Sequence, residues 1–403
     1  MVLDHSVDAS GQQQHDSVKR VITTPRSSLR DAALKHQFEF SLETGIPFWD
    51  ESAYYTFSHQ QIEEHIIKSA ENIENMCFQV VERAITDETI FQKIGIDRCY
   101  WDLIANSWND KERNLLGRMD FAYNGKGLPK LLEYNADTPT TLYESSIFQW
   151  EWFEESIDQG LLSSSGDQFN NIHEKIVEAF KTIGIESILH LTANKDIEDD
   201  WGTIEYIADC AIEAGLLTHL IDITDIGLGD DDRFSDTDGK PIAELYKLYP
   251  WEWILAEEFG KNVYRSQCKF IEPPWRCVLS NKGLLPILWE MFEGHPNLLP
   301  AYFTGDPEIE KIKSSSVKKP IFGRQGANIA IERNGQIIDS RDGPYTNGPF
   351  IKQEFYSLPD FKGHFPVVGC WVVASRAVGL GVREDTNLIT GNKANFIPHI
   401  VEN

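Results

Sequence analysis

Four polar side chains near residue 125 have the types and spacing of a site for a metal ion and an anion. Arg118, Asp120, Glu133 and Asn135 lie in two short runs of alternating polar and apolar residues. The runs flank the sequence Asn-Gly-Lys-Gly at residues 124–127, a turn typical of a β-hairpin. Because strand side chains alternate between faces, the four polar side chains share one face. Carboxylate and amide oxygens bind hard cations, and a guanidinium beside them binds anions.

The register of this hairpin follows from pairing Tyr123 with Leu128 across the turn. That pairing makes Asp120 and Glu133 diagonal neighbours, roughly 7–8 Å apart at the backbone. Two bare carboxylates at ~4 Å repel by roughly 4 kcal/mol at an effective dielectric constant of about 20, and a divalent ion removes that cost. Mg²⁺ commonly uses one or two carboxylates and fills its other positions with water and phosphate oxygens. The pattern indicates a Mg-nucleotide site, although an exposed hairpin with an Arg118–Glu133 pair would have the same spacing.

The elements that must position the hairpin lie on both sides of it. Residues 27–116 have a mostly helical pattern. Beyond the hairpin, Ser187–Leu191, Trp201–Ala214 and Leu217–Ile223 read as strand, helix and strand. That order predicts a small α/β domain with parallel strands.

A glycine-rich tip in the last third of the chain is the second candidate site. Residues 323–328 (Gly-Arg-Gln-Gly-Ala-Asn) connect two predicted strands, 317–322 and 329–333. Glycines at such a tip let backbone N–H groups approach an anion, and Lys319 and Arg324 supply positive charge. No Gly-Lys-Ser/Thr precedes a helix here, so the tip is not a Walker loop.

Further strands strengthen this assignment. The strand 350–355 carries Gln353 and Glu354, a donor and acceptor pair suited to an adenine edge. Residues 366–373 and 377–382 predict an antiparallel pair that ends next to Arg383. Together with the hairpin, these strands outline an antiparallel nucleotide clamp.

Composition narrows the function classes. The chain has 403 residues, 41% hydrophobic and 25% charged, which predicts a globular protein of two or three domains. Its net charge of −26 argues against nucleic-acid binding, because phosphate contacts need basic surface. The acidity suits a cationic substrate, or it contributes only to solubility.

Cysteine usage and the absence of long apolar runs predict a cytoplasmic protein. The six cysteines are scattered and form no CxxC pair, which suits free thiols in a reducing compartment. No run of 18 apolar residues exists, so no membrane segment is expected. Residues 1–26 begin with a polar stretch that lacks a signal-peptide core, and we predict a disordered leader.

Five ordered motifs resemble the glutathionylspermidine synthetase family, from about Ser27 to the C-terminus. They are Arg118-Met-Asp120-Phe, Leu132-Glu-Tyr-Asn-Ala-Asp137, Leu248-Tyr-Pro-Trp-Glu-Trp253, Lys319-Pro-Ile-Phe-Gly-Arg-Gln-Gly326 and Gly381-Val-Arg-Glu-Asp385. The resemblance implies a mixed α+β and α/β chain with an ATP-grasp fold. We divide it into a helical segment at 27–115, the metal hairpin with a pre-ATP-grasp α/β domain at 116–270, and an ATP-grasp region at 271–403.

The resemblance also implies an activity and residue roles. In that family, ATP phosphorylates the glycine carboxylate of glutathione, and an amine of spermidine displaces the phosphate to form an amide. By motif, the expected magnesium ligands for two ions are Asp120, Glu133 and Asn135. The expected catalytic residues are Arg118 and Arg383. The expected ATP-binding residues are Lys282, Lys319, Arg324, Gly326, Gln353 and Glu354. The expected substrate residues are Thr138, Thr140, Asp199 and Asp200.

Two departures from the family pattern affect the expected substrates. Only about a hundred residues precede the hairpin, and Cys77 lies in a predicted helix without a catalytic partner, so we expect no amidase domain. Thr138 and Thr140 are bulkier than the serine or cysteine that would leave room for a thiol peptide. The sequence therefore does not identify glutathione or spermidine as the substrates.

Three functions remain open from the sequence. The first is an ATP-dependent carboxylate–amine ligase acting on a peptide and a polyamine or other amine. The second is a non-catalytic nucleotide-binding homologue, against which the retained Arg383 counts. The third is a carboxylate phosphotransferase that releases a stable phosphorylated product. The oligomeric state and the pathway do not follow from the sequence.

Overall fold

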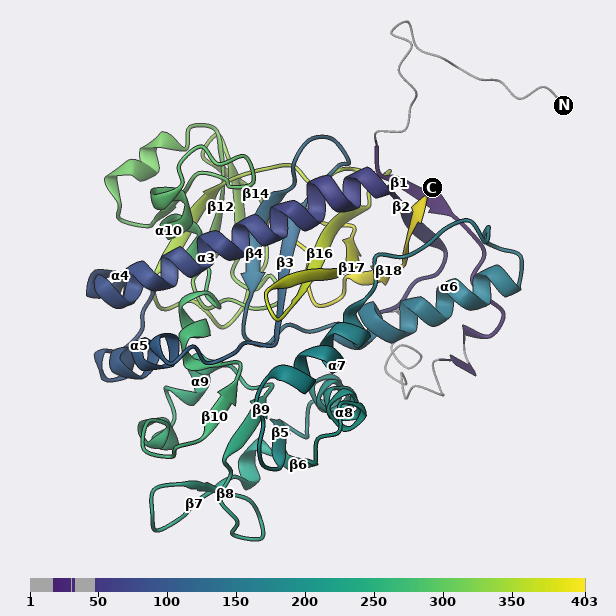
Figure 1. Cartoon of the computed structure of the whole chain (residues 1–403). Coiled ribbons are helices and arrows are strands. Elements are labelled where there is room, and N and C mark those ends of the chain that lie inside the picture. Colours follow the sequence, from purple (N-terminus) through teal and green to yellow (C-terminus); the bar gives the residue numbers. More distant parts are fainter. Residues whose placement is uncertain (1–16, 30, 33–47, 403) are drawn as a thin grey trace, which may run out of the picture.

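The computed structural model describes residues 17–29, 31–32 and 48–402 (Figure 1). Residues 1–16 of the predicted leader lie outside the described part. Lys19–Ile22, however, form strand β1, so this part of the leader prediction is wrong. β1 pairs with β2 (Ala53–Ser58), which in turn pairs in parallel with β19 (His399–Glu402). The two ends of the described chain therefore meet in one three-stranded sheet.

The central sheet joins the predicted hairpin to strands from the end of the chain. Its order is β18 (Asn395–Ile397), β17 (Arg376–Asp385), β16 (Phe365–Val373), β3 (Leu116–Ala122) and β4 (Lys130–Asn135), all antiparallel. The predicted antiparallel pair in the last third is thus confirmed. Helix α3 (Lys68–Thr86) crosses this sheet (Figure 1). Met119 and Cys370 belong to the same buried apolar cluster as Ile73 and Val80 of α3, which leaves the other face for polar side chains.

The hairpin register differs from the predicted one. Asp120 lies directly opposite Glu133, and Arg118 lies opposite Asn135. A bulge between Asp120 and Phe121 and a longer turn shift the pairing. The shift near Asp120 is two residues, an even number, so the predicted face is retained while the diagonal relation becomes a direct one.

A second antiparallel sheet has the order β11 (Ala301–Phe303), β15 (Phe350–Glu354), β12 (Ser315–Pro320), β13 (Ala330–Arg333) and β14 (Gln336–Ser340). The predicted pairing on either side of residues 323–328 is confirmed as β12 with β13. The sheet lies beside the central one, with helix α10 (Leu284–Met291) packed against β11 and β15.

The predicted α/β unit has four parallel strands. Their order is β10 (Lys269–Ile271), β9 (Glu244–Lys247), β5 (Leu189–Ala193) and β6 (Thr218–Asp222). Helices α7 (Ile172–Thr182) and α8 (Glu198–Glu213) pack against each other, and α8 packs against β5 and β6. Parallel pairing of β5 with β6 confirms the predicted α/β unit.

The remaining elements are helices and short strands. The helices are α4 (Glu88–Lys93), α5 (Trp101–Asn109), α6 (Gln149–Asp158) and α9 (Trp251–Ile254). Strands β7 (Gly227–Leu228) and β8 (Phe234–Ser235) form a small hairpin. Short 3₁₀ or π-helical turns are η1 (Gln61–Ile67), η2 (Arg98–Tyr100), η3 (Glu144–Phe148), η4 (Ile223–Asp225), η5 (Glu258–Asn262), η6 (Pro274–Val278) and η7 (Pro307–Lys311).

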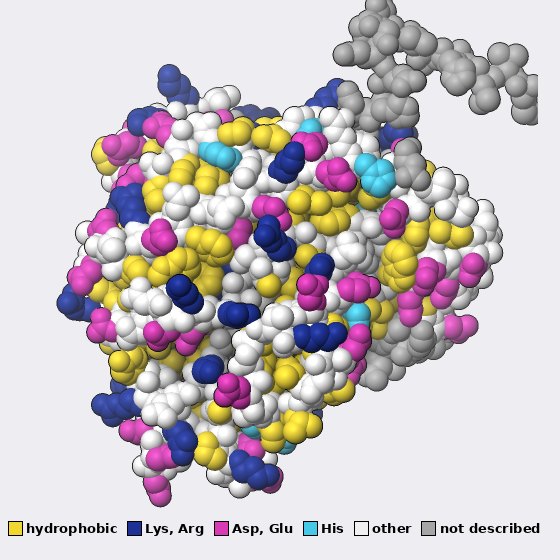
Figure 2. Space-filling model, in the orientation of Figure 1, with side chains coloured by type: hydrophobic (Ala, Val, Ile, Leu, Met, Phe, Trp, Pro, Cys, Tyr) yellow, Lys and Arg dark blue, Asp and Glu magenta, His cyan; other side chains and the backbone are white. Residues whose placement is uncertain are grey.

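The division of the chain at residues 115/116 and 270/271, which was made from the sequence, stays a prediction. Residues 116–135 form two strands of the central sheet with β16, so the hairpin packs with the C-terminal strands. Across the described residues, none of the helices combines the length and apolarity needed to cross a membrane. On the face drawn in Figure 2, lysine and arginine side chains are interspersed with acidic ones.

Candidate active site

A cavity of about 1100 Å³ lies between the central sheet, the β12–β13 tip and the start of α8. Every site residue predicted from the sequence lines it. The hairpin and its following loop contribute Arg118, Asp120, Glu133, Asn135, Thr138 and Thr140; the C-terminal elements contribute Lys282, Lys319, Arg324, Gly326, Gln353, Glu354 and Arg383; α8 contributes Asp199 and Asp200. The antiparallel pairing across β4, β3, β16 and β17 explains why residues so far apart in sequence converge.

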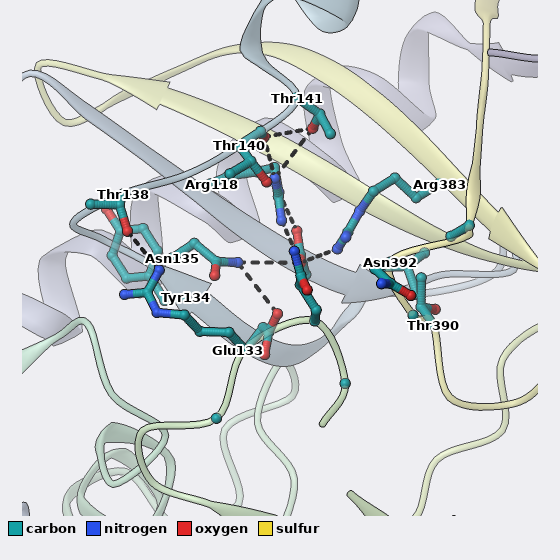
Figure 3. A pocket seen from close by; sticks show the side chains of 18 of the residues that line it. Arg118, Glu133, Tyr134, Asn135, Thr138, Thr140, Thr141, Arg383, Thr390 and Asn392 are labelled. Atoms are coloured by element: carbon teal, nitrogen blue, oxygen red, sulfur yellow. Dashed lines mark hydrogen bonds and ion pairs between the residues drawn. The ribbon is translucent and has the colours of Figure 1, made fainter. Parts of the chain in front are cut away.

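The Asp120 carboxylate is the centre of the polar face (Figure 3 shows its neighbours). Arg118 donates to both of its oxygens, with Nε–Oδ1 at 2.7 Å and Nη2–Oδ2 at 3.0 Å. Arg383 of β17 donates to Oδ2 at 2.8 Å. Asp120 is 2% exposed, so removing its charge would leave buried guanidinium groups without their acceptor.

Gly369 makes room for this arrangement. It pairs with Asp120 on one side and with Gly381 on the other. A Cβ atom at Gly369 would lie 2.9 Å from Cδ of Arg118. The absence of a side chain therefore lets Arg118 lie across β16.

Glu133 lies beside Asp120 in a cluster of cations. Lys282 Nζ lies 3.1 Å from Glu133 Oε2. Burial would raise the pKa of Glu133, but Lys282, Lys319 and Arg383 outweigh burial and hold this pKa well below its usual range. The carboxylate is therefore ionised throughout the physiological pH range.

Asn135 lies between the two carboxylates. Its Nδ2 is 3.3 Å from Asp120 Oδ2 and 3.4 Å from Glu133 Oε1 (Figure 3). Rotation of this amide would place its oxygen, in place of the nitrogen, between the two carboxylates. Two carboxylates and one amide oxygen fit the donor set of Mg²⁺, whose other positions go to water and phosphate. Within the described ranges, no third His, Cys, Asp or Glu completes a closed metal cage.

Gln353 fixes the position of the Lys319 side chain by a hydrogen bond. Its Nζ donates to Gln353 Oε1 at 2.8 Å and to the Leu132 carbonyl at 2.9 Å. Burial, together with Lys282, lowers the pKa of Lys319 to about 8. Gln353 also donates to the Leu131 carbonyl at 3.1 Å, so both ends of its amide are used within the protein. Glu354, the next residue on β15, is exposed and lies on the opposite face of the strand.

Arg324 and Gly326 bring the β12–β13 tip to the hairpin loop. Arg324 donates to Thr138 Oγ1 at 3.0 Å and to Glu252 Oε1 at 2.9 Å. Gly326 has a φ of +74°, and a Cβ there would lie 2.7 Å from the Thr390 carbonyl. Both constraints favour glycine at this position.

The other end of the cavity is acidic. Asp199 and Asp200 lie in the first turn of α8, and Glu144 of η3 faces the same space. Burial and Asp199 raise the pKa of Asp200 to about 6. Burial and Glu198 likewise raise the pKa of Asp199. The cavity is therefore divided between a cationic end, which suits polyphosphate, and an acidic end, which suits an amine.

Several cavity residues did not stand out in the sequence. Glu144 belongs to a stretch whose aromatic residues dominate its pattern. Glu252 and Trp253 belong to the family motif at residues 248–253, but the sequence does not show which side chains they contact. Thr390 and Asn392 lie near Arg383 (Figure 3) on the loop that follows β17, where only tertiary structure brings them to the site.

Comparisons with known proteins show the family to which the chain belongs. A family profile described as glutathionylspermidine synthase preATP-grasp matches residues 20–402. The chain is 38% identical over 366 residues to a protein of Haemophilus influenzae named "Putative acid--amine ligase", covering 88% of this chain and 91% of that protein. It is 25% identical over 374 residues to the bifunctional glutathionylspermidine synthetase/amidase of Escherichia coli, covering 86% of this chain and 59% of that protein.

One solved structure shows the shared fold. A glutathione synthetase-like effector from Globodera pallida, in its apo form, has a TM-score of 0.55 at 10% identity. The likeness covers 94% of this chain and 98% of that chain. The predicted ATP-grasp architecture with antiparallel sheets is thereby confirmed.

Proposed function

Because the chain belongs to the glutathionylspermidine synthase preATP-grasp family, it is an ATP-dependent carbon–nitrogen ligase, and we propose that it joins its substrates through an acyl-phosphate at the Asp120–Glu133 face. One observation carries this proposal: Arg118, Arg383, Lys282 and Lys319 surround two carboxylates in a chain whose net charge is −26. Such a concentration of cations in an acidic protein suits a polyphosphate substrate.

In the first step, a carboxylate oxygen of the acid substrate attacks the γ-phosphorus of ATP, and ADP leaves. Charge shifts between phosphoryl oxygens during this transfer, and fixed guanidinium groups stabilise it without reorganising. Arg118 and Arg383 fit that role because Asp120 holds both of them within 3.0 Å. No protein nucleophile is needed.

Asp120, Glu133 and Asn135 are the proposed magnesium ligands, for two ions. When bound there, Mg²⁺ would neutralise part of the charge of the polyphosphate. Both carboxylates line the cavity, and neighbouring cations keep that of Glu133 ionised, as a magnesium ligand must be. Binding would displace the amide N–H of Asn135 from between them.

The remaining cationic groups are proposed phosphate contacts. Lys282 and Lys319 lie next to Glu133, and Arg324 with Gly326 covers the same space from the β12–β13 tip. Gln353, which was predicted to frame adenine, is proposed instead to orient Lys319, because both ends of its amide bind protein groups. Glu354 remains the proposed adenine contact.

The acid substrate is proposed to lie beside the cationic end of the cavity, and the amine at the acidic end. Thr138 and Thr140 lie next to Arg324 and Arg118, where the acid substrate must bring its carboxylate. Asp199 and Asp200 would attract a cationic amine. We propose a peptide and a polyamine or other amine as the substrate classes. We also propose that the enzyme is cytoplasmic, which its six unpaired cysteines support, and that it binds no nucleic acid, which its acidic net charge supports.

The test is ADP release from Mg-ATP across a matrix of peptides, glutathione included, and amines, including spermidine, putrescine and amino acids. The amide product is identified by mass spectrometry. We expect release that requires both an acid and an amine. Release with the acid alone, accompanied by a stable phosphorylated product, would identify a phosphotransferase, and ATP binding without release in any combination would favour a non-catalytic homologue.

The Glu133→Gln variant is the negative control for the ADP-release measurements. Among the described residues, the Glu133 carboxylate forms an ion pair with Lys282 alone, whereas Asp120 pairs with both Arg118 and Arg383, so the substitution disturbs the fold less than a change at Asp120. Glu332→Gln is the matched control, since Glu332 pairs with Lys352 at 2.6 Å in the neighbouring sheet and does not line the cavity.

A further inference from the structure

Glu144 is a buried carboxylate that the proposed activation step does not use. It is the first residue of η3, a π-helical segment, and only 8% of its surface is exposed. It lines the cavity. Among the described residues, no lysine, arginine or histidine forms an ion pair with it, unlike Asp120 and Glu133. Such irregular helical turns are frequent at functional sites.

Glu144 faces the acidic end of the cavity, and its neighbours connect it to the proposed phosphoryl-transfer centre and to α8. On one side, Arg118 donates to the Thr140 carbonyl at 2.5 Å and to Thr141 Oγ1 at 3.3 Å, which joins the turn before η3 to the proposed phosphoryl-transfer centre. On the other side is Asp199 of α8, which raises the pKa of Glu144 by repulsion. The Glu144 carboxylate is therefore close enough to interact electrostatically both with Arg118 of the proposed phosphoryl-transfer centre and with Asp199 of the surface that would attract an amine.

The surroundings of Glu144 bring the pKa of its carboxyl group close to neutral pH. Burial is the largest effect, and with Asp199 it raises the pKa of Glu144 to about 7, against the opposing effects of its own backbone N–H and Arg118. Two of the elements that pack against η3 carry ionisable groups with other partners: Arg383 of β17 pairs with Asp120, and His173 of α7 pairs with Tyr206 and Glu213. A base with a pKa near the working pH is the most effective kind.

We propose that Glu144 is the general base that deprotonates the amine substrate for attack on the acyl-phosphate. This role rests on the proposed ligase function and adds the group that activates the nucleophile. An amine attracted by Asp199 and Asp200 arrives as an ammonium ion, which has no lone pair. One proton passes from nitrogen to Glu144, and the free amine then forms the C–N bond. The C–O bond to phosphate breaks, and the second nitrogen proton leaves with the phosphate.

The test compares Glu144→Gln with the wild type using two nucleophiles on the acid substrate found in the ADP-release matrix. Hydroxylamine is neutral at pH 7 and converts an acyl-phosphate to a hydroxamate without needing a base. We expect E144Q to retain hydroxamate and ADP formation and to lose amide formation with the alkylamine by about 10²- to 10⁴-fold at pH 7. The loss should shrink as pH rises, because free amine becomes abundant without a base.

Two further variants separate a catalytic role from a structural one. Glu144→Asp keeps a carboxylate. It should restore part of the amide formation, and the rise of the amide-forming rate with pH near pH 7 should return with it. Glu205→Gln is the matched control; this exposed carboxylate of α8 lines the same cavity and binds Trp201 Nε1 at 3.0 Å. It should keep the wild-type pH profile.

Three results would overturn the assignment. Equal losses with hydroxylamine and with alkylamine in E144Q would assign Glu144 to the fold or to phosphoryl transfer. Wild-type amide formation by E144Q at pH 7 would exclude it as the base. Absence of hydroxamate in the wild type would instead overturn the acyl-phosphate function itself and this role with it.

Discussion

Arg383 donates a hydrogen bond of 2.8 Å to Asp120 although 263 residues separate the two in the chain. Three adjacent strands, β3, β16 and β17, make that contact possible, because their antiparallel register brings both residues to one face. The same carboxylate holds Arg118 on its other side. Two guanidinium groups with fixed positions can stabilise a transferring phosphoryl group, whereas mobile ones would have to be ordered first.

Replacing Arg383 should slow turnover more than it weakens ATP binding. We expect Arg383→Ala to lower kcat by about 10²- to 10³-fold, since removal of one fixed donor to a developing charge commonly costs that much. Steady-state kinetics and calorimetry with ATP measure the two effects. Arg376→Ala is the control on the same strand, where Arg376 is exposed and pairs with Glu71 at 3.5 Å. A large loss of ATP affinity with unchanged kcat would assign Arg383 to ground-state binding.

ATP affinity should fall as pH rises through about 8. Burial lowers the pKa of Lys319 to about 8, so the free protein loses this positive charge over that range, while the ordinary lysine pKa is higher. Bound phosphate favours the protonated form, so affinity is greatest below pH 8. Titration calorimetry at several pH values measures the trend.

Lys319→Met should remove this dependence on pH, and Lys318→Met should not. Lys318 is the adjacent residue on β12 and lies on the other face, with its Nζ 4.6 Å from the Phe350 ring centroid. A pH trend that persists unchanged in Lys319→Met would assign it to another group.

Gly369→Ala should impair the site without touching a proposed ligand. The new Cβ would lie 2.9 Å from Arg118 Cδ, so the Arg118 side chain must move from Asp120. We expect kcat to fall by about 10-fold or more, because positioning errors of about 1 Å already cost large factors. Gly202→Ala in α8 is a control, as a Cβ there meets nothing within 4 Å. Wild-type kcat in Gly369→Ala would show that Arg118 tolerates displacement.

The buried pair of Lys247 and Asp137 should matter mainly for stability. Both side chains are almost fully buried, and Asp137 also accepts from the Trp251 backbone N–H at 2.8 Å. Lys247→Met leaves Asp137 as an unpaired buried charge, and the free energy of unfolding should fall by about 3–5 kcal/mol. Urea denaturation measures this. If Lys247→Met together with Asp137→Asn does not recover part of the loss, the pair is not the cause.

The sequence predicts the polar face of the hairpin well, because the period of two in a strand keeps Arg118, Asp120, Glu133 and Asn135 on one side for any register shift of an even number of residues. It does not predict the bulge after Asp120, which depends on how β3 pairs with both β4 and β16. The adenine-binding role predicted for Gln353 rests on its residue type, its place on a strand and the family resemblance, and only its contact with Lys319 reveals that its amide is already used.

Glu144 shows a second limit. Its importance comes from burial and from Asp199, a residue of another helix, and neither is visible in local spacing. Strand β1 was likewise missed because its partner β2 lies more than 30 residues away in the chain, across a segment without strand signals. Local patterns predict elements, whereas the environment of a side chain depends on contacts between them.

The most direct test of the central claim follows oxygen atoms through the reaction. The acid substrate identified by ADP release is labelled with ¹⁸O in its carboxylate, and the wild-type enzyme joins it to the amine in the presence of Mg-ATP. An acyl-phosphate intermediate predicts one ¹⁸O atom in the inorganic phosphate released, read by mass spectrometry. Phosphate without label, formed together with the amide, would contradict the proposed mechanism.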